Sequence, residues 1–165
     1  MSESFFLTES LAKEAIRLTM PTIQAFMNEG IAVRHDLHIV ILDPAIPYSP
    51  ITDFTETILV EHSLGDVENW QHDYAEIACG KAANSWRTGK ETHDLRSTPW
   101  LYRLADVRFA GSSVRDNIIV ACSGVQGHFD RMFAGMIREA CEGLCIDAYE
   151  RYMASNPPGN VFSPQ

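Results

Sequence analysis

The stretch that decides the fold is RFAGSSVRDNIIVACSGVQGHFDRMFAGMIREACEGLCIDAYERYM, residues 108–153. It opens with two runs typical of β-strands, 108–114 and 118–123, on either side of Arg115-Asp116-Asn117. Asp and Asn tolerate the left-handed dihedrals of a tight turn, so the two runs predict a β-hairpin. Ser123-Gly124 ends the second strand and leads directly into a helical pattern.

That pattern is one unbroken stripe of apolar side chains at positions i, i+3 and i+4, which predicts a single long amphipathic helix. The stripe consists of Phe129, Met132, Phe133, Met136, Ile137, Ala140, Cys141, Leu144, Cys145, Ala148 and Tyr149. It is wider than one small sheet needs, so part of it would suit a subunit interface. Asn156-Pro157-Pro158-Gly159 ends the helix, and we expect residues 154–165 to form a flexible tail.

Before the hairpin, a helix and two strands are expected. Thr8 is a good N-cap for a helix that reaches Gly30, and Pro21 must kink or split that helix. Residues 37–43 and 57–62 have the β-branched composition of strands. Prolines at 44, 47 and 50 predict that residues 44–53 form a loop and not an interior strand.

Residues 70–86 return to helical spacing, and 99–104 predict a short further helix. The resulting order predicts an α/β protein of the α+β kind. Its sheet would be mixed and mostly antiparallel, with the N-terminal and long C-terminal helices packed on it. The 165 residues predict a single domain, 1–165, with its core over about 7–153.

Composition limits the partners. Thirteen basic and 22 acidic residues give a net charge of −9, which disfavours nucleic acid and anionic membrane surfaces. No apolar run has the ~18 residues of a membrane span. The N-terminus is acidic where a secretory signal is basic, so we expect a cytoplasmic location. There the four cysteines, at 79, 122, 141 and 145, are expected to be reduced and mostly buried.

Three strings, in order, resemble the GlcG/HbpS family, which comprises the DUF336 domain and the C-terminal domain of PduO-type proteins. They are Leu7-Thr8-Glu9 before a helix, 78–85 (ACGKAANS) with Lys81 at the family's lysine, and 118–124 (IIVACSG) followed by Asp130. The resemblance covers about 7–150 and implies an oligomeric small-ligand or cofactor binder, in some members a haem binder.

The chain departs from the family pattern in its loops. Pro44-Ala45-Ile46-Pro47 stands where the family has glycines after its first strand, and against the family pattern residues 44–56 look like a lengthened loop. Ser63-Leu64-Gly65-Asp66 replaces the family's Arg-Met-Asp. The last strand lacks the usual Gly-Ala-Ile-Gly. These departures bear on the ligand more than on the fold.

Five residues are candidates for ligand binding: His128, Ser123, Gly124, Asp130 and Lys81. His128 follows the Ser-Gly turn, where free backbone N–H groups can meet an anion, and an imidazole is a common haem ligand. The alternative is a solvent-exposed histidine at a helix start. Lys81 could hold a carboxylate or propionate as a point charge, or be an ordinary surface lysine.

His62, His72 and Asp66 are weaker candidates for a metal site, since their spacing matches no metal motif. His35 and His38 are three apart, and a shared metal is not expected of them. The function hypotheses are therefore a small-molecule or cofactor binder with haem as a possible ligand, a metal-dependent enzyme on a small acid (a lyase, isomerase or hydrolase), and an accessory subunit without ligand. A homo-oligomer is expected in each case.

Overall fold

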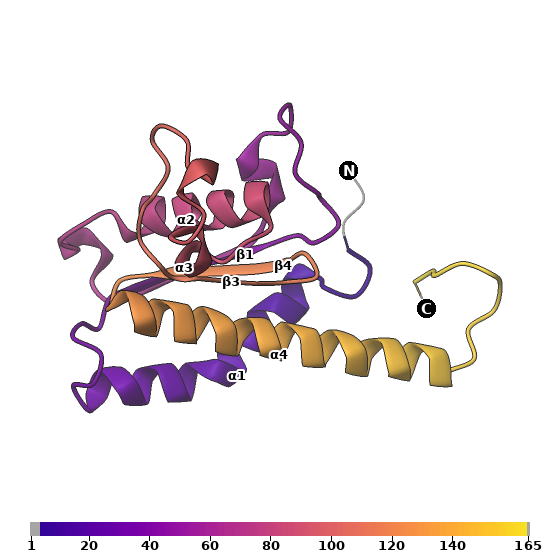
Figure 1. Cartoon of the computed structure of the whole chain (residues 1–165). Helices are drawn as coiled ribbons and strands as arrows, with labels where there is room; N and C mark the ends of the chain where they lie inside the picture. Colours follow the sequence, from indigo (N-terminus) through magenta and orange to yellow (C-terminus); the bar gives the residue numbers. More distant parts are fainter. Residues whose placement is uncertain (1–3, 165) are drawn as a thin grey trace.

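The computed structural model describes residues 4–164 and shows three layers (Figure 1). Strands β1 (Leu37–Leu42), β2 (Ile58–Leu64), β3 (Ser112–Arg115) and β4 (Ile118–Ser123) form one sheet in the order β2-β1-β4-β3, with every neighbouring pair antiparallel. Helices α1 (Glu9–Asn28) and α4 (Gly127–Ala154) cover one face, and α2 (Tyr74–Thr88) covers the other. This confirms the α+β fold class.

Short elements complete the chain between the strands. They are α3 (Thr92–Leu95) and single 3-10 turns at Phe54–Thr57, Val67–Asn69 and Pro99–Leu101. None of the helices in residues 4–164 is long and apolar enough to cross a bilayer.

The hairpin forms as expected, but its first strand is shorter. Asp116 and Asn117 take φ of 46° and 67°, the left-handed pair that a two-residue hairpin turn requires. Strand β3 begins at Ser112 and not near Arg108. At Gly111 the φ of 147° interrupts the regular extended chain just before it.

Helix α1 begins where its cap predicts: the Thr8 hydroxyl accepts a hydrogen bond from the Leu11 N–H at 3.2 Å. Pro21 lies inside one continuous helix, so it does not split α1 as one of the two expectations had it. The Thr19 hydroxyl in the preceding turn donates to the Ala15 carbonyl at 2.9 Å.

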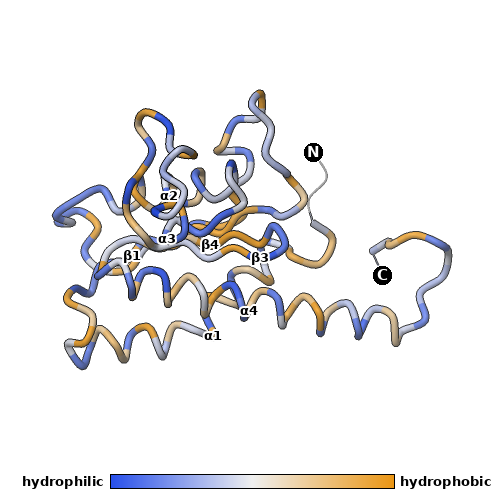
Figure 2. Tube along the Cα trace, in the orientation of Figure 1, coloured by the Kyte–Doolittle hydropathy of each residue, from blue (hydrophilic) through white to orange (hydrophobic). Residues whose placement is uncertain are grey.

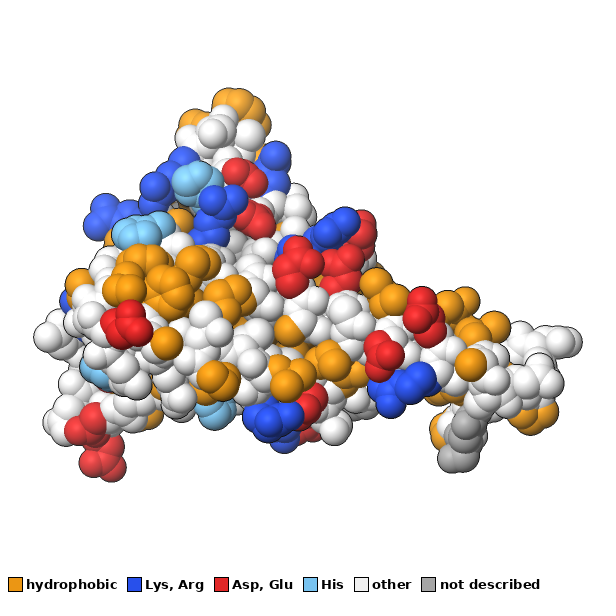
Figure 3. All heavy atoms as spheres, turned by 90° about the horizontal axis from the view of Figure 1, so that it is seen from below, with side chains coloured by type: hydrophobic (Ala, Val, Ile, Leu, Met, Phe, Trp, Pro, Cys, Tyr) orange, Lys and Arg blue, Asp and Glu red, His pale blue; other side chains and the backbone are white. Residues whose placement is uncertain are grey.

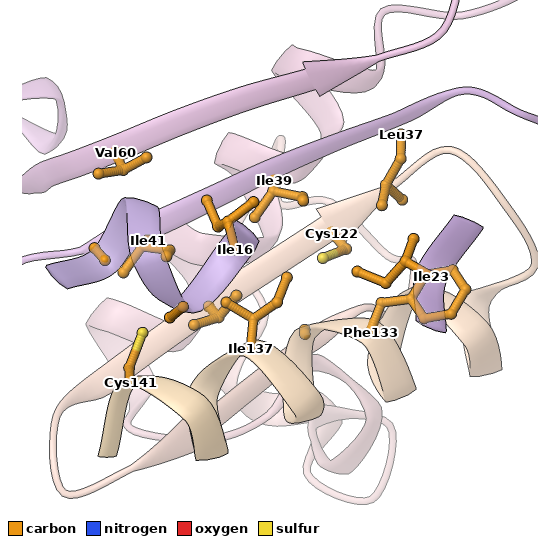
Figure 4. Packing of buried hydrophobic residues seen from close by; sticks show 14 of the residues in the cluster. Ile16, Ile23, Leu37, Ile39, Ile41, Val60, Cys122, Phe133, Ile137 and Cys141 are labelled. Carbon is orange, nitrogen blue, oxygen red and sulfur yellow. The ribbon is translucent and has the colours of Figure 1, made fainter. Parts of the chain in front are cut away.

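Side-chain alternation divides the core into two clusters, one on each face of the sheet. Figure 4 shows the larger one, in which Ile39 and Ile41 of β1 face Ile16 of α1 and Ile137 of α4. The smaller one packs α2 on the other face and contains Val40, Leu42, Ala78, Ala82, Ile119 and Ala121. Figure 2 shows the same arrangement as largely apolar strands between helices of alternating hydropathy.

The last part of α4 projects beyond the sheet, and its buried positions end at Cys141 (Figure 1). The following segment turns back, so that five aromatic rings gather there: Phe5, Phe6, Tyr149, Tyr152 and Phe162. The Tyr152 hydroxyl accepts from the Ser163 N–H at 3.0 Å. The flexibility expected of 154–165 stays a prediction, because static contacts do not measure motion.

Candidate functional site

The structure brings Lys81 and Asp130 together as a buried ion pair. Lys81 extends from α2, and its Nζ lies 3.0 Å from Oδ2 of Asp130 at the start of α4 and 2.8 Å from the Cys122 carbonyl oxygen. Their side chains are 1% and 4% exposed. The pair therefore joins the helical layers on the two sides of the sheet, and the Lys81 ammonium already has carboxylate and carbonyl partners.

Burial raises the pKa of Asp130 to about 6, against the opposing effect of the Lys81 ammonium. The other carboxylate oxygen accepts the Val125 N–H at 3.1 Å. Asp130 thus holds the turn between β4 and α4 in place as well as pairing with Lys81.

Gly124 has a structural reason to be a glycine. Its φ is 155°, and a Cβ there would lie 2.1 Å from the carbonyl oxygen of Asp36. Backbone atoms cannot yield as a flexible side chain can, so the Ser123-Gly124 turn is needed for the close approach of two chain segments.

His128 is exposed at the beginning of α4, with its ring 4.3 Å from that of Phe129. The loop 44–56 does not lie beside this turn. Strand β1 pairs His38 with Ser123 and Ile41 with Val120, so the loop leaves β1 at the end farther from Ser123. The loop instead contacts α2 near its C-terminal end, where the Trp86 indole N–H donates to the Ile46 carbonyl at 2.8 Å.

A groove of about 500 Å³ lies on the face of the sheet that α1 and α4 cover, between α1 and the edge strand β2. It is lined by Lys13, Ile16, Arg17, Met20, Pro21, Gln24, Val60, Glu61 and His62. Its floor is apolar, and two cations and an imidazole surround it. Lys13 pairs with Glu9, and Arg17 pairs with Glu14 at 2.6 Å, but exposed pairs of this kind are weak and rearrange readily.

A polar cluster lies on the α2 side of the sheet. The Nε2 of His38 is 3.0 Å from Oε1 of Glu61, and the Cys79 Sγ is 3.5 Å from the same oxygen. The His38 Nδ1 is 2.8 Å from the Ser63 hydroxyl. Beside His38 lies the ring of Trp70, with centroids 6.2 Å apart.

The surroundings of Cys79 are not those of a catalytic nucleophile. Burial first, and then the charges of Glu61 and Asp73, raise the pKa of its thiol to about 12. A thiol with that pKa is protonated at neutral pH, whereas catalytic cysteines have depressed values.

The weak metal candidates named from the sequence lie apart from this cluster. In residues 4–164 a single group of three potential ligand atoms lies within 4.8 Å of one another, and it consists of His38, Glu61 and Cys79. His62 faces the groove, Asp66 accepts from Asn69 at 2.7 Å, and the His72 ring lies 6.1 Å from that of Tyr74.

Sequence reasoning missed both the groove and the polar cluster. Glu61 and Cys79 are 18 residues apart, and only strand register and helix packing bring them to His38. One signal was present: His38 and Glu61 are polar residues that interrupt two neighbouring apolar strands.

Comparison with known proteins supports the fold. ORFY, a Klebsiella pneumoniae protein described as DUF336, is similar over 82% of this chain and 90% of its own, with TM-score 0.57 and 15% identity. A crystal structure of a PduOC–haem complex is similar over 85% of this chain and 95% of its own, with TM-score 0.51 and 20% identity. No family model and no curated sequence matches the chain. The chain has the DUF336 fold of GlcG/HbpS proteins, as its sequence predicts.

Proposed function

We propose that this protein binds a small amphipathic anion, with haem as the first ligand to test, in the groove between α1 and β2. The observation that carries the proposal is the composition of that groove. Its volume of about 500 Å³ is within the ~300–1,000 Å³ usual for small-molecule sites. An apolar floor with Lys13 and Arg17 beside it suits a ligand that has a hydrophobic body and carboxylates.

The donor set of the groove fits haem. His62 is two residues after Val60 in β2, so both side chains lie on the same face of the strand and line the groove. An imidazole beside an apolar surface is a suitable ligand for haem iron. Lys13 and Arg17 would hold the propionates. When bound, haem would supply the redox and gas-binding chemistry of its iron. A neighbour of the same fold is a haem complex, which adds support.

The turn at Ser123-Gly124 with His128, Lys81 and Asp130 is the second proposed location. Its support is weaker because Lys81 and Asp130 are occupied by each other. His128 is nevertheless exposed to solvent.

Haem titration followed by absorbance tests both locations. We expect a shifted Soret band in the wild type, loss of the shift in His62→Ala, and retention in His128→Ala. His93→Ala, an exposed histidine on α3, is the matched control. Loss only in His128→Ala would move the ligand to the start of α4. A wild type that gives no Soret shift removes haem as the ligand, and failure to bind an apolar sulfonate dye as well removes the small-ligand proposal.

We also propose that the protein is a cytoplasmic homo-oligomer. The support for assembly is a row of exposed apolar side chains at Ile146, Tyr149 and Met153. Their spacing of three and four residues places them on one face of the part of α4 that projects from the sheet. Figure 3 shows apolar side chains along this projection.

A further inference from the structure

The cluster of His38, Glu61 and Cys79 has the geometry of a metal centre. The three side chains come from three different elements: β1, β2 and α2. A tetrahedral zinc ion with bonds of about 2.0–2.3 Å holds its ligand atoms roughly 3.3–3.7 Å apart. The distances of 3.0 Å for nitrogen to oxygen and 3.5 Å for sulfur to oxygen are close to this, and all three atoms lie within 4.8 Å of one another.

The ligand types also match. Imidazole, thiolate and carboxylate are the three side chains that bind zinc, and an N, O, S set leaves a fourth position for water or substrate. The His38 side chain is 6% exposed, whereas that of Glu61 is 45% exposed, so the cluster is anchored on one side and accessible on the other.

Outer contacts would hold the imidazole in place. Metal-binding histidines usually donate their second ring N–H to a neighbouring oxygen, which fixes the tautomer and the ring orientation. The Ser63 hydroxyl lies 2.8 Å from Nδ1, so it can accept the Nδ1 proton when Nε2 binds a metal. Without a metal, Nε2–H can donate to the Glu61 carboxylate at 3.0 Å, and the metal would take the place of that proton.

The surroundings contain unsatisfied polar groups as well. The Trp70 indole nitrogen and the Tyr74 hydroxyl are buried and have no hydrogen-bond partner within residues 4–164, and their rings lie 5.3 Å apart beside the cluster. Buried polar atoms without partners are rare in native proteins and often mark a site for water, an ion or a ligand.

We propose that His38, Glu61 and Cys79 bind a divalent metal ion of the Zn²⁺ class with an open fourth position. Binding forms a bond from the metal to the Cys79 sulfur and releases the thiol proton to solvent. Glu61 also lines the groove, but the metal proposal does not rest on the ligand of the groove. That ligand is tested by a different spectrum and by His62→Ala, a variant that keeps all three proposed metal ligands.

The test uses the full chain, stripped with a chelator and titrated with Zn²⁺ and, separately, with Co²⁺. We expect one metal per chain and an absorption band from thiolate-to-cobalt charge transfer. Loss of an outer-shell partner of a metal ligand typically costs ~10–100-fold in affinity. We therefore expect Cys79→Ser and Glu61→Gln to lower Zn²⁺ affinity by at least about tenfold, and Cys79→Ser to abolish the band.

Cys145→Ser is the matched control, since Cys145 is a half-buried free thiol on α4. It should keep both affinity and band. The wild type gives a second measurement that needs no variant: Zn²⁺ should slow alkylation of Cys79 and leave that of Cys145 unchanged. Failure to bind either metal at one per chain, a cobalt band that persists in Cys79→Ser, or an unprotected Cys79 would each overturn the proposal.

Discussion

At the scale of single residues, Lys81 and Asp130 show how a buried charge depends on its partner. Asp130 has a pKa of about 6 in the folded protein, above its ordinary 3.8, because burial disfavours the carboxylate. Between about pH 4 and pH 6 the folded state therefore holds this proton more tightly than the unfolded state. The contribution of Asp130 to stability consequently falls as the pH rises through that window.

In Lys81→Met the decrease in the stability contribution of Asp130 with rising pH should continue above pH 6. The variant lacks the ammonium that lowers the pKa of Asp130, so that pKa rises further. Each unit of pKa corresponds to about 1.4 kcal/mol. We expect Lys81→Met to be mildly destabilised at pH 5.5 and more so, by about 1–3 kcal/mol, at pH 8.

Urea unfolding of wild type and Lys81→Met at the two pH values measures the difference. Lys13→Met removes an exposed lysine, and its difference from the wild type in free energy of unfolding should be the same at both pH values. If Lys81→Met differed from the wild type in free energy of unfolding by the same amount at both pH values, the role assigned to the ion pair would be contradicted.

At the scale of elements, α4 has two parts with different surroundings. Its first half packs Phe133, Ile137 and Cys141 into the core, with none of them accessible to solvent. Its second half extends past the sheet (Figure 1). The first half of α4 therefore stabilises the fold, whereas the second half carries the exposed apolar side chains Ile146, Tyr149 and Met153.

Ile137→Ala should lower the free energy of unfolding by about 2–5 kcal/mol, because it removes buried methyl groups and leaves a cavity. Leu18→Ala on α1, a side chain that is half exposed, should change it by about 0.5 kcal/mol or less. Chemical denaturation of both variants checks this. Equal effects would mean that α4 is not packed on the sheet as described.

At the scale of the whole molecule, the expected homo-oligomer is the main prediction. Light scattering after size exclusion, or native mass spectrometry, should show a discrete assembly for the wild type. Ile146→Glu places a charge in the exposed apolar face of α4 and should shift the protein toward the monomer. Ile51→Glu, at a 93% exposed position in the loop 44–56, is the matched control and should leave the assembly unchanged. A wild-type monomer at micromolar concentration would remove the prediction.

The elements and their order could be predicted from the sequence alone, because the signals for them are local. The hairpin follows from Asp116-Asn117, the long last helix from its apolar stripe, and the interruption after β1 from three prolines. The resemblance placed Lys81 and Asp130 in one site, and they do meet, at 3.0 Å. The hairpin, the helix and the interruption after β1 were predictable because each of these signals lies within a few residues of the structure that it specifies.

The positions of the candidate residues relative to one another follow from tertiary packing. It turned Lys81 inward to an ion pair, left His128 on the surface, and placed the start of the loop 44–56 at the end of β1 that is farther from Ser123. It also placed His62 at an apolar groove and brought Cys79 within reach of His38 and Glu61. These outcomes depend on strand register and on how α1 and α2 pack on opposite faces of the sheet. Both are long-range properties that no spacing along the chain encodes.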